Sequence, residues 1–543
     1  MKFSDKNNLI FLLLLFMFAI QIARHFNDFY VPESDFFDYR EKAIDLRHFE
    51  EPANFKRPPL FSLAIAILSA PLQGKFRELY AAELIVALSA LFSLFFVYSI
   101  SKHFIGKYAF WLAWIWALHP TTLRMAIKPK PEMFVTVLIL WAFDRFLKGD
   151  RKAYLIAFAA TMVRYEGAIA IVALFAADFL FTKAKVKSLL YAFLAGTPLV
   201  LWTLLHSEGS NGGSYGNYFN AYKPNFAFFE TFWNGLLGFL PVHLFRVWTL
   251  LGAIFLSAGL VLGIIRFKKE TTALLTYLLG FIVMHIIWPF SNIDYIVIIA
   301  WTAFLFMFLA AHWFYALLRP WLVHLLDATW MRWLGFALAA CVLGVIFVYR
   351  FPFPQYNVDP VLMITFTAPA LLYFWWNVDL TRKTGRGGMS WALAVLMILA
   401  FWLNSKTNAD FFDIHYSKAE FRKVGEWFER NFHPGDKLAV AQPIVVSFYT
   451  NLNAEKDFVR ITDIPPGEPD QIHDWLIAHH VTFIAWLSTN KVYEKGDAWY
   501  SWKRDNRGWR TIKFLQDGNN VPGFDLVKEI RVGPRWGYVY RPE

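Results

Sequence analysis

The 543-residue sequence has little charge and almost no cysteine. Charged residues make up 17% of it and hydrophobic residues 57%, with 57 Phe and 24 Trp. A soluble domain has about 25% charged residues, so this balance excludes an ordinary soluble protein and predicts that most of the chain lies in a lipid bilayer. The one cysteine, Cys341, excludes an intrachain disulfide and leaves the redox compartment undetermined.

Motifs of several soluble enzyme classes are also missing. The sequence has no Walker sequence, no Gly-rich dinucleotide loop and no Gly-x-Ser-x-Gly elbow, which argues against nucleotide-sugar use and serine hydrolysis. The net charge is +11, but residues 405–543 hold 19 basic and 19 acidic residues, so the surplus belongs to the apolar part. The positive-inside rule explains this surplus better than nucleic acid, and we expect no nucleic-acid partner.

Apolar runs predict a polytopic α-helical membrane protein. The runs fall at 9–24, 79–101, 107–123, 131–147, 153–163, 168–182, 188–206, 244–265, 271–289, 294–317, 333–350, 360–377 and 389–404. The first run lacks a small-residue cleavage site behind it, which favours an uncleaved anchor. Residues 60–72 are apolar but fall short of the roughly 20 residues of a spanning helix, so we expect an interfacial helix there.

Charge placement sets the expected orientation. If residues 60–72 do not span, seventeen basic and four acidic residues lie in loops on one side, which the positive-inside rule makes cytoplasmic. The prediction is about 13 transmembrane helices in the cell (inner) membrane, with the N-terminus in the cytoplasm. The transmembrane domain is expected at 1–404, with a first extracytoplasmic loop at 24–78. An extracytoplasmic α/β domain is expected at 405–543.

The C-terminal domain shows both helical and strand periodicities. Phe421, Val424, Phe428 and Phe432 recur at helical spacing. Strands are expected at 438–441 and 481–487 with a helix at 471–480, followed by a hairpin of 524–532 and 536–540.

The first loop, residues 33–60, places carboxylates ahead of a basic turn. Asp35 and Asp38 precede Lys56-Arg57-Pro58-Pro59-Leu60. Two later outward-facing turns are also charged: the Lys130-Pro131-Glu132 turn, and Arg164-Tyr165-Glu166-Gly167 between two abbreviated helices. Carboxylates that accept a proton and cations that stabilise a departing phosphate are what glycosyl transfer from a lipid phosphate requires.

The pattern Asp35-x-x-x-Tyr39-x-x-x-Ala43, followed by Lys56-Arg57-Pro58-Pro59-Leu60, resembles the first extracytoplasmic loop of the GT-C superfamily. The similarity is greater to the branch of protein O-mannosyltransferases and lipid A aminoarabinose transferases, and it extends through the turns at 130–132 and 164–167. The resemblance implies a GT-C-like membrane glycosyltransferase that moves a monosaccharide from a polyprenyl-phosphate donor to an acceptor hydroxyl with inversion. The acceptor would be a glycan, a lipid or a protein, and membrane lipids surround the enzyme.

The resemblance also implies roles for individual residues. Asp35 would be the base; because Phe36 stands where many relatives have a second acid, Asp38 is the alternative. The residues expected to bind the donor phosphate are Lys56, Arg57, Lys128, Lys130 and Arg164. The residues expected to contact substrate are Tyr39, Glu132, Glu166, His119 and His243. Asp294, ahead of Tyr295, departs from the Arg-Tyr pair that relatives often carry there.

Structural readings compete with these roles. Lysines and arginines near helix ends commonly snorkel, Glu132 would complement a helix dipole, and Glu166 would neutralise Arg164. No metal motif is evident; Asp410, Asp413 and His415 could bind a cation, but a charged linker is the preferred reading, and divalent-ion use stays open. The rival functions are a lipid or lipid-linked-sugar transporter or flippase, and a non-catalytic lipid-sugar-binding relative. The absence of internal repeats and the outer position of the polar residues favour the enzyme.

Overall fold

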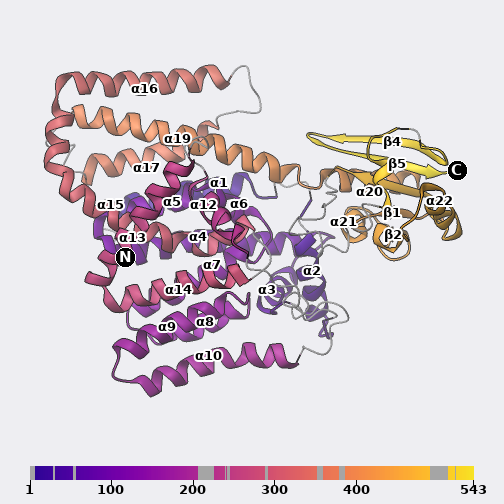
Figure 1. Cartoon of the computed structure of the whole chain (residues 1–543), viewed down its shortest axis with the longest axis horizontal. Helices are drawn as coiled ribbons and strands as arrows, with labels where there is room; N and C mark the ends of the chain where they lie inside the picture. Colours follow the sequence, from indigo (N-terminus) through magenta and orange to yellow (C-terminus); the bar gives the residue numbers. More distant parts are fainter. Residues whose placement is uncertain are drawn as a thin grey trace. The chain divides into compact units, whose positions relative to one another are not determined.

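The computed structural model describes residues 6–27, 31–32, 34–52, 57–205, 225–238, 240, 245–287, 292–350, 359–377, 386–488, 511–519 and 521–543 (Figure 1). The chain forms two compact units. The first consists of Met1–Asn27 and Tyr39–Phe411, and the second of Asp28–Asp38 and Phe412–Glu543.

The first unit is helical throughout the part of it that the structure describes. Its helices are α1 (Lys6–Arg24), α2 (Ser34–Arg47, which begins in the second unit), α3 (Leu60–Ser69), α4 (Arg77–Ile105), α5 (Ala109–Leu118), α6 (Pro120–Ile127), α7 (Glu132–Leu147), α8 (Lys152–Thr161), α9 (Gly167–Phe181), α10 (Lys185–Leu205), α12 (Ala227–Leu237), α13 (Phe245–Arg266), α14 (Lys268–Ile287), α15 (Ile296–Asp327), α16 (Thr329–Arg350), α17 (Pro360–Asn377) and α19 (Arg386–His415). Each of the thirteen predicted runs overlaps a helix of this set.

One predicted run, 107–123, is divided into α5 and α6. The break lies at His119, whose backbone is extended (φ −64°, ψ 129°). Pro120 follows it, and a residue before proline is pushed out of the helical region by the proline ring. Pro120 then occupies the first turn of α6, where its missing N–H costs nothing. The sequence contained this signal, but apolarity alone did not separate the two helices.

The chain is a multi-pass integral membrane protein. Seven helical stretches of the described part are long and apolar enough to cross a membrane: Lys6–Arg24, Arg77–Leu118, Lys185–Leu204, Phe245–Arg266, Lys268–Ile287, Ile293–Leu322 and Ser390–Ala409. Shorter apolar helices accompany them, including α3, α8 and α9. The short hairpin around residue 164 is therefore confirmed as a pair of abbreviated helices, whereas the total of 13 spans stays a prediction.

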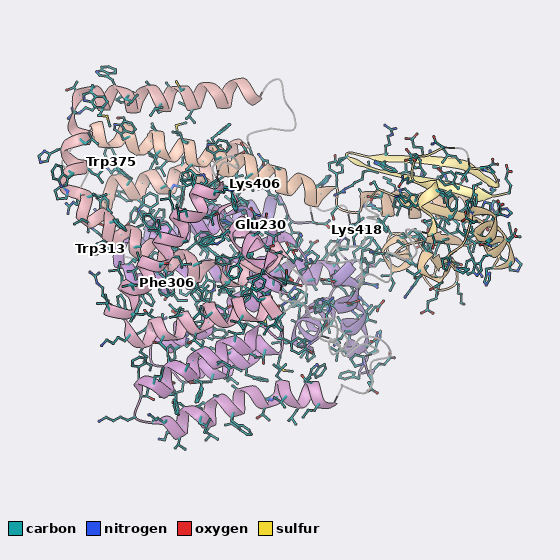
Figure 2. The ribbon with its side chains drawn as sticks, in the orientation of Figure 1. Glu230, Phe306, Trp313, Trp375, Lys406 and Lys418 are labelled. Carbon is teal, nitrogen blue, oxygen red and sulfur yellow. The ribbon has the colours of Figure 1, made fainter. Side chains whose placement is uncertain are left out.

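Helix pairs both near and distant in sequence pack together in the first unit. α4 packs against α5 and α7, α9 against α8 and α14, and α13 against α15 (Figure 1). The largest fully buried side chains include Trp114, Trp116 and Trp301. Other aromatic side chains are exposed, such as Trp313 on α15 and Trp375 on α17 (Figure 2). Exposed aromatic and aliphatic side chains on long helices are typical of a lipid-facing surface.

The second unit contains a five-stranded mixed sheet with strand order β2-β1-β3-β5-β4. Its strands are β1 (Leu438–Val440), β2 (Phe458–Arg460), β3 (Phe483–Leu487), β4 (Phe524–Val532) and β5 (Arg535–Pro542). β1 pairs in parallel with β2 and β3, while β3–β5 and β5–β4 are antiparallel. Its helices are α20 (Ala419–Asn431), α21 (Pro443–Ser447) and α22 (Pro469–Ala478). The predicted helices, strands and closing hairpin are confirmed; β2 and α21 are additions.

The predicted domain boundary at 404/405 stays a prediction beside this division into units. α19 continues through that position to His415, and the second unit begins at Phe412. It also includes Asp28–Asp38, where Phe36 and Phe37 pack edge-on against Phe448 with ring centroids 6.2 and 5.1 Å away. Both phenylalanines are buried. A segment assigned by sequence to the membrane part thus contributes its aromatic pair to the C-terminal unit.

Candidate functional site

The turn between α6 and α7 brings three basic side chains onto one carboxylate. Lys128 Nζ and Lys130 Nζ lie 3.3 and 3.0 Å from the Oδ2 atom of Asp294, and Arg124 donates to Oδ1. Pro129 and Pro131 hold the turn, and Asn292 fixes Asp294 by accepting its backbone N–H at 3.0 Å. Lys130 and Asp294 are each only 3% exposed. Three basic side chains thus converge on one buried carboxylate.

The α8–α9 turn carries a second ion-pair group. Arg164 donates to Glu166 at 2.6 Å and to Glu132 at 3.0 Å, and its guanidinium lies 5.0 Å from the centre of the Tyr295 ring. The two helices approach closely because Gly167 has no side chain: a Cβ there would lie 2.4 Å from the backbone of Ala160. The hairpin therefore fixes Arg164 between two carboxylates and an aromatic face.

The first loop reaches the same hairpin. The backbone N–H of Leu60 donates to the carbonyl of Met162 at 2.8 Å, just after Pro58 and Pro59. Arg57 donates to the Tyr39 hydroxyl at 3.2 Å, and its guanidinium lies 4.8 Å from the centre of that ring. Lys42, one turn further along α2, donates to the Arg57 carbonyl at 2.7 Å. These contacts fix Arg57 and Tyr39 next to the hairpin.

Glu132 and Tyr295 join the groups into one cluster. Glu132 forms an ion pair with Arg164 and interacts electrostatically with Lys130 and Asp294. Tyr295 follows Asp294 in sequence, and the guanidinium of Arg164 lies over its ring. We name this set the cationic cluster; its charged members are Arg57, Arg124, Lys128, Lys130, Arg164, Glu132, Glu166 and Asp294. Five of these side chains are basic and three are acidic, and cations gathered in this way suit an anionic ligand.

Two pKa shifts at the cluster are set by burial and by Arg164. Burial raises the pKa of the Tyr39 phenol above its usual value, although Arg57 and Arg164 act in the opposite direction. Burial also acts to raise the pKa of Glu166, but Arg164 outweighs it and the net pKa is lowered. Tyr39 is therefore a neutral phenol whose oxygen accepts from Arg57 and whose O–H can donate, and Glu166 is a carboxylate. A neutral O–H donor beside several cations suits phosphate oxygens.

Glu132 has one carboxylate oxygen without a hydrogen-bond partner. Its Oε1 atom accepts from Arg164, while its Oε2 atom is buried and unpaired among the described residues. Glu132 begins α7, where a carboxylate complements the helix dipole. The dipole accounts for its placement, and the unpaired oxygen leaves one acceptor for a ligand hydroxyl.

His119 is held by its backbone neighbours. Its Nδ1 atom accepts from the backbone N–H of Thr121 at 3.3 Å as the N-cap of α6, and its Nε2 atom lies 3.2 Å from the Leu236 carbonyl. The ring is 3% exposed. Both nitrogens are thus engaged in joining α6 to α12, which favours the structural reading of this residue over a substrate contact.

Other predicted site residues cannot be placed in the cluster. Lys56 and His243, and the side chains of Asp410 and Asp413, lie outside the described residues. Asp35 and Asp38 occupy the first two turns of α2, in the part assigned to the second unit, and both are half-buried. On the continuous helix, Asp35 lies one turn before Tyr39. The roles of both acids stay predictions.

Sequence reasoning missed Arg124, and it did not pair Asp294 with any basic residue. Asp294 stands as a departure from a family pattern in the sequence, whereas in the structure it is the counter-ion of Arg124, Lys128 and Lys130. Arg124 precedes Lys128 by four residues, and this basic spacing was the available signal. The partner lies about 170 residues away in sequence, so no local pattern pairs them.

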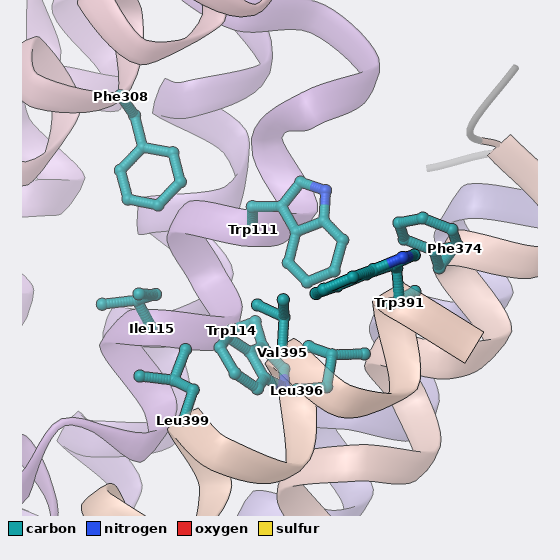
Figure 3. Close-up of a pocket in the computed structure, with 10 residues that line it drawn as sticks. Trp111, Trp114, Ile115, Phe308, Phe374, Trp391, Val395, Leu396 and Leu399 are labelled. Carbon is teal, nitrogen blue, oxygen red and sulfur yellow. The ribbon is translucent and has the colours of Figure 1, made fainter. Parts of the chain in front are cut away.

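The described residues contain no group of three or more His, Cys, Asp or Glu side chains able to hold a metal ion. A cavity of about 360 Å³ lies elsewhere, between α5, α15, α17 and α19. Figure 3 shows Trp111, Trp114 and Trp391 around it with Phe308 and Phe374. Its lining is apolar, so this cavity offers no chemistry of the kind seen in the cationic cluster.

Comparison with solved structures decides the fold. The crystal structure of ArnT from Cupriavidus metallidurans bound to undecaprenyl phosphate matches with a TM-score of 0.52 at 12% identity, covering 98% of this chain and 97% of that one. Its apo structure matches with a TM-score of 0.51. The apo oligosaccharyltransferase of Archaeoglobus fulgidus matches with a TM-score of 0.52 at 11% identity, over 89% of this chain and 70% of that one. The chain has the GT-C fold.

Sequence comparison adds nothing further. No protein-family model matches the chain, and no curated protein matches it by sequence. The structural match covers nearly the whole chain, and it confirms the resemblance that residues 35–60 show in the sequence. Identities of 11–12% establish the shared fold alone.

Proposed function

We propose that this protein is an inverting glycosyltransferase that moves a monosaccharide from a polyprenyl-phosphate donor to an acceptor hydroxyl at the extracytoplasmic face. The observation that carries the proposal is the cationic cluster on a GT-C fold. Its five converging basic side chains suit a phosphate leaving group, and ArnT, which shares the fold, was crystallised with undecaprenyl phosphate.

The cluster offers two kinds of phosphate contact. Arg57 and Arg164 present planar guanidinium groups suited to bidentate contact, whereas Lys128 and Lys130 act as point charges. Tyr39 adds a neutral O–H donor beside Arg57. Because negative charge grows on the phosphate as the glycosidic bond breaks, contacts that strengthen at that stage lower the barrier.

The carboxylates divide into two roles under this proposal. Asp294 and Glu166 hold the cations in place before the donor arrives. Glu132 accepts a hydrogen bond from a hydroxyl of the sugar through its Oε2 atom, which has no partner among the described residues. Asp35, one turn before Tyr39 on α2, takes the proton of the acceptor hydroxyl, with Asp38 as the alternative base.

The test is binding of undecaprenyl phosphate to the purified protein in nanodiscs, followed by native mass spectrometry. Lys130→Gln should weaken binding about tenfold, since one desolvated cation is lost from the phosphate contacts. Lys148→Gln is the matched control: it lies at the other end of α7, paired with Asp144, and should leave binding unchanged. Equal binding by wild type and Lys130→Gln would contradict the phosphate site. Binding without any transfer across a panel of donors and acceptors would instead indicate a non-catalytic relative.

A further inference from the structure

A second basic group lies away from the cationic cluster, around His312 on α15. Lys107, in the short 3-10 helix η1 (Gly106–Tyr108), and Arg266, the last residue of α13, are both exposed. Both interact electrostatically with His312. Neither forms an ion pair with an acidic side chain of the described residues, and Glu270, the next acid after Arg266 in sequence, forms none there either. The two cations are therefore available to an anionic ligand.

Ring contacts hold Lys107 and His312 in place. The ring centroids of Tyr108 and His312 lie 4.5 Å apart, and Lys107 Nζ lies 5.3 Å from the centre of the Tyr108 ring. The hydroxyl of Tyr373, on α17, donates to the carbonyl of Lys107. The Nδ1 atom of His312 is buried and has no hydrogen-bond partner within the described part of the chain. One nitrogen of the imidazole is thus open to a ligand atom.

This group, which we name the basic end group (Lys107, Arg266 and His312), is separate from the cationic cluster. α15 begins at Ile296, shortly after Asp294 of the cluster, and it continues past His312. The helical rise places His312 about 24 Å along the axis from Ile296, which approaches the roughly 30 Å thickness of a hydrocarbon core. The two groups therefore lie near opposite faces of a bilayer. Under the predicted orientation, the basic end group faces the cytoplasm.

The apolar cavity between α5, α15, α17 and α19 lies one helical turn from the basic end group. Trp111 follows Lys107 by four residues and Phe308 precedes His312 by four, and both line the cavity (Figure 3). Four residues correspond to about 6 Å along a helix. Val395 also lines the cavity and is 56% exposed, so the cavity adjoins the lipid-facing surface. Its volume of about 360 Å³ and its apolar lining suit a hydrocarbon chain.

We propose that the basic end group binds the phosphate of an anionic phospholipid, and that one acyl chain of this lipid occupies the apolar cavity. The two exposed cations attract the negative charge, and the open nitrogen of His312 contacts a phosphate oxygen. The cavity one turn away distinguishes a lipid from a soluble phosphate, because only the lipid has a chain to fill it. The inference does not depend on the proposed transferase activity, since none of its residues belongs to the cationic cluster.

The test uses the full chain in nanodiscs or mild detergent, with phosphatidylglycerol as the probe in native mass spectrometry. Lys107→Gln with Arg266→Gln should weaken retention of phosphatidylglycerol about tenfold or more, as expected for two cations at a membrane surface. Lys183→Gln with Lys187→Gln is the matched control: it removes two exposed cations of the connection between α9 and α10, and it should bind as wild type does. Unchanged binding in the first variant, or an equal loss in the control, would overturn the phosphate site.

Two further measurements test the lipid assignment. Val395→Trp places a large side chain at an exposed position of the cavity lining, where it can be accommodated without disturbing the core, and it should weaken retention several-fold. Wild-type retention in this variant would overturn the assignment of the acyl chain. Displacement of phosphatidylglycerol by millimolar inorganic phosphate would overturn the choice of a lipid. Arg266→Lys keeps the charge and should retain most of the binding; a loss as complete as in the glutamine variant would contradict recognition by charge.

Discussion

Lys130 Nζ lies 3.0 Å from the Oδ2 atom of Asp294, although 164 residues separate them in sequence. The contact joins the α6–α7 turn to the start of α15 and gives three basic side chains a common counter-ion. It also shows what the acid before Tyr295 does: Asp294 pairs with basic residues from α6 and the turn that follows it.

The first prediction concerns this counter-ion. Asp294→Asn leaves Arg124, Lys128 and Lys130 without their carboxylate, and breaking a buried ion pair typically costs about 3–5 kcal/mol. We expect a lower melting temperature in nanodiscs and a larger stabilisation by added undecaprenyl phosphate than in wild type, because the ligand then supplies the missing negative charge.

Asp144→Asn is the matched control for that measurement. Asp144 is also buried and paired with a lysine on the same bundle, but lies at the far end of α7. It should lower the melting temperature without increasing the ligand-induced shift. Equal shifts in both variants would show that Asp294 has no relation to an anion site.

The second prediction concerns the close approach of α8 and α9. In Gly167→Ala the new methyl group would lie 2.4 Å from the Ala160 backbone, so the hairpin must open. Overpacking of this kind typically costs about 1–3 kcal/mol, and Arg164 would shift away from Glu132. Thermal unfolding and donor binding should both be impaired.

Gly196→Ala provides the control, since a Cβ at that helical position of α10 meets nothing within 4 Å. Removing a flexible glycine from a helix there should be neutral or stabilising by up to about 1 kcal/mol. A Gly167→Ala protein as stable as Gly196→Ala would contradict the tight hairpin.

Much of the fold could be predicted because its signal is local. A continuous apolar run specifies a membrane helix wherever it occurs, and all thirteen runs lie on helices. α12 was missed because polar residues interrupt it: Phe228, Phe232 and Leu236 are buried, whereas Glu230 is exposed. An apolar-run criterion does not detect a helix of 11 residues whose apolar residues are interrupted by polar ones.

The site was predictable only where its residues share a turn. Lys128, Lys130 and Glu132 lie within five residues, and Arg164 and Glu166 within three, so their sequence motifs drew attention to them. Arg124 follows directly after the apolar run 107–123. Its place in the cluster comes from its ion pair with Asp294, which tertiary packing brings next to it. The grouping of Phe36 and Phe37 with Phe448 has the same origin, since no sequence pattern links residues so far apart.

The third prediction separates phosphate binding from ion pairing at Arg164. Arg164→Lys keeps the charge but loses the planar fork, so donor affinity should fall if the residue grips a phosphate. The double change Arg164→Met with Glu166→Met removes the ion pair as a unit. Retained transfer in that double variant would remove Arg164 from the site; loss of transfer with a folded protein would support it.

The fourth prediction concerns orientation. If residues 60–72 do not span, seventeen basic residues occupy loops of one side, and the C-terminal unit should lie outside the cytoplasm. A reporter that is active only in the cytoplasm, fused after Glu543, should therefore be silent, and the same reporter fused after Lys187 should be active. Activity of the fusion after Glu543 would reverse the proposed topology.

The last prediction addresses the base. Asp35→Asn keeps the size of the side chain but cannot accept a proton, and loss of general-base assistance typically costs about 10²–10⁴ in rate, or roughly 3–5 kcal/mol of barrier. Donor affinity should change far less, because the carboxylate acts on the acceptor. Asp38→Asn, one turn away on the same helix, is measured beside it. A collapse of turnover for Asp38→Asn alone would move the role to Asp38, and normal turnover of both folded variants would show that neither acid is the base.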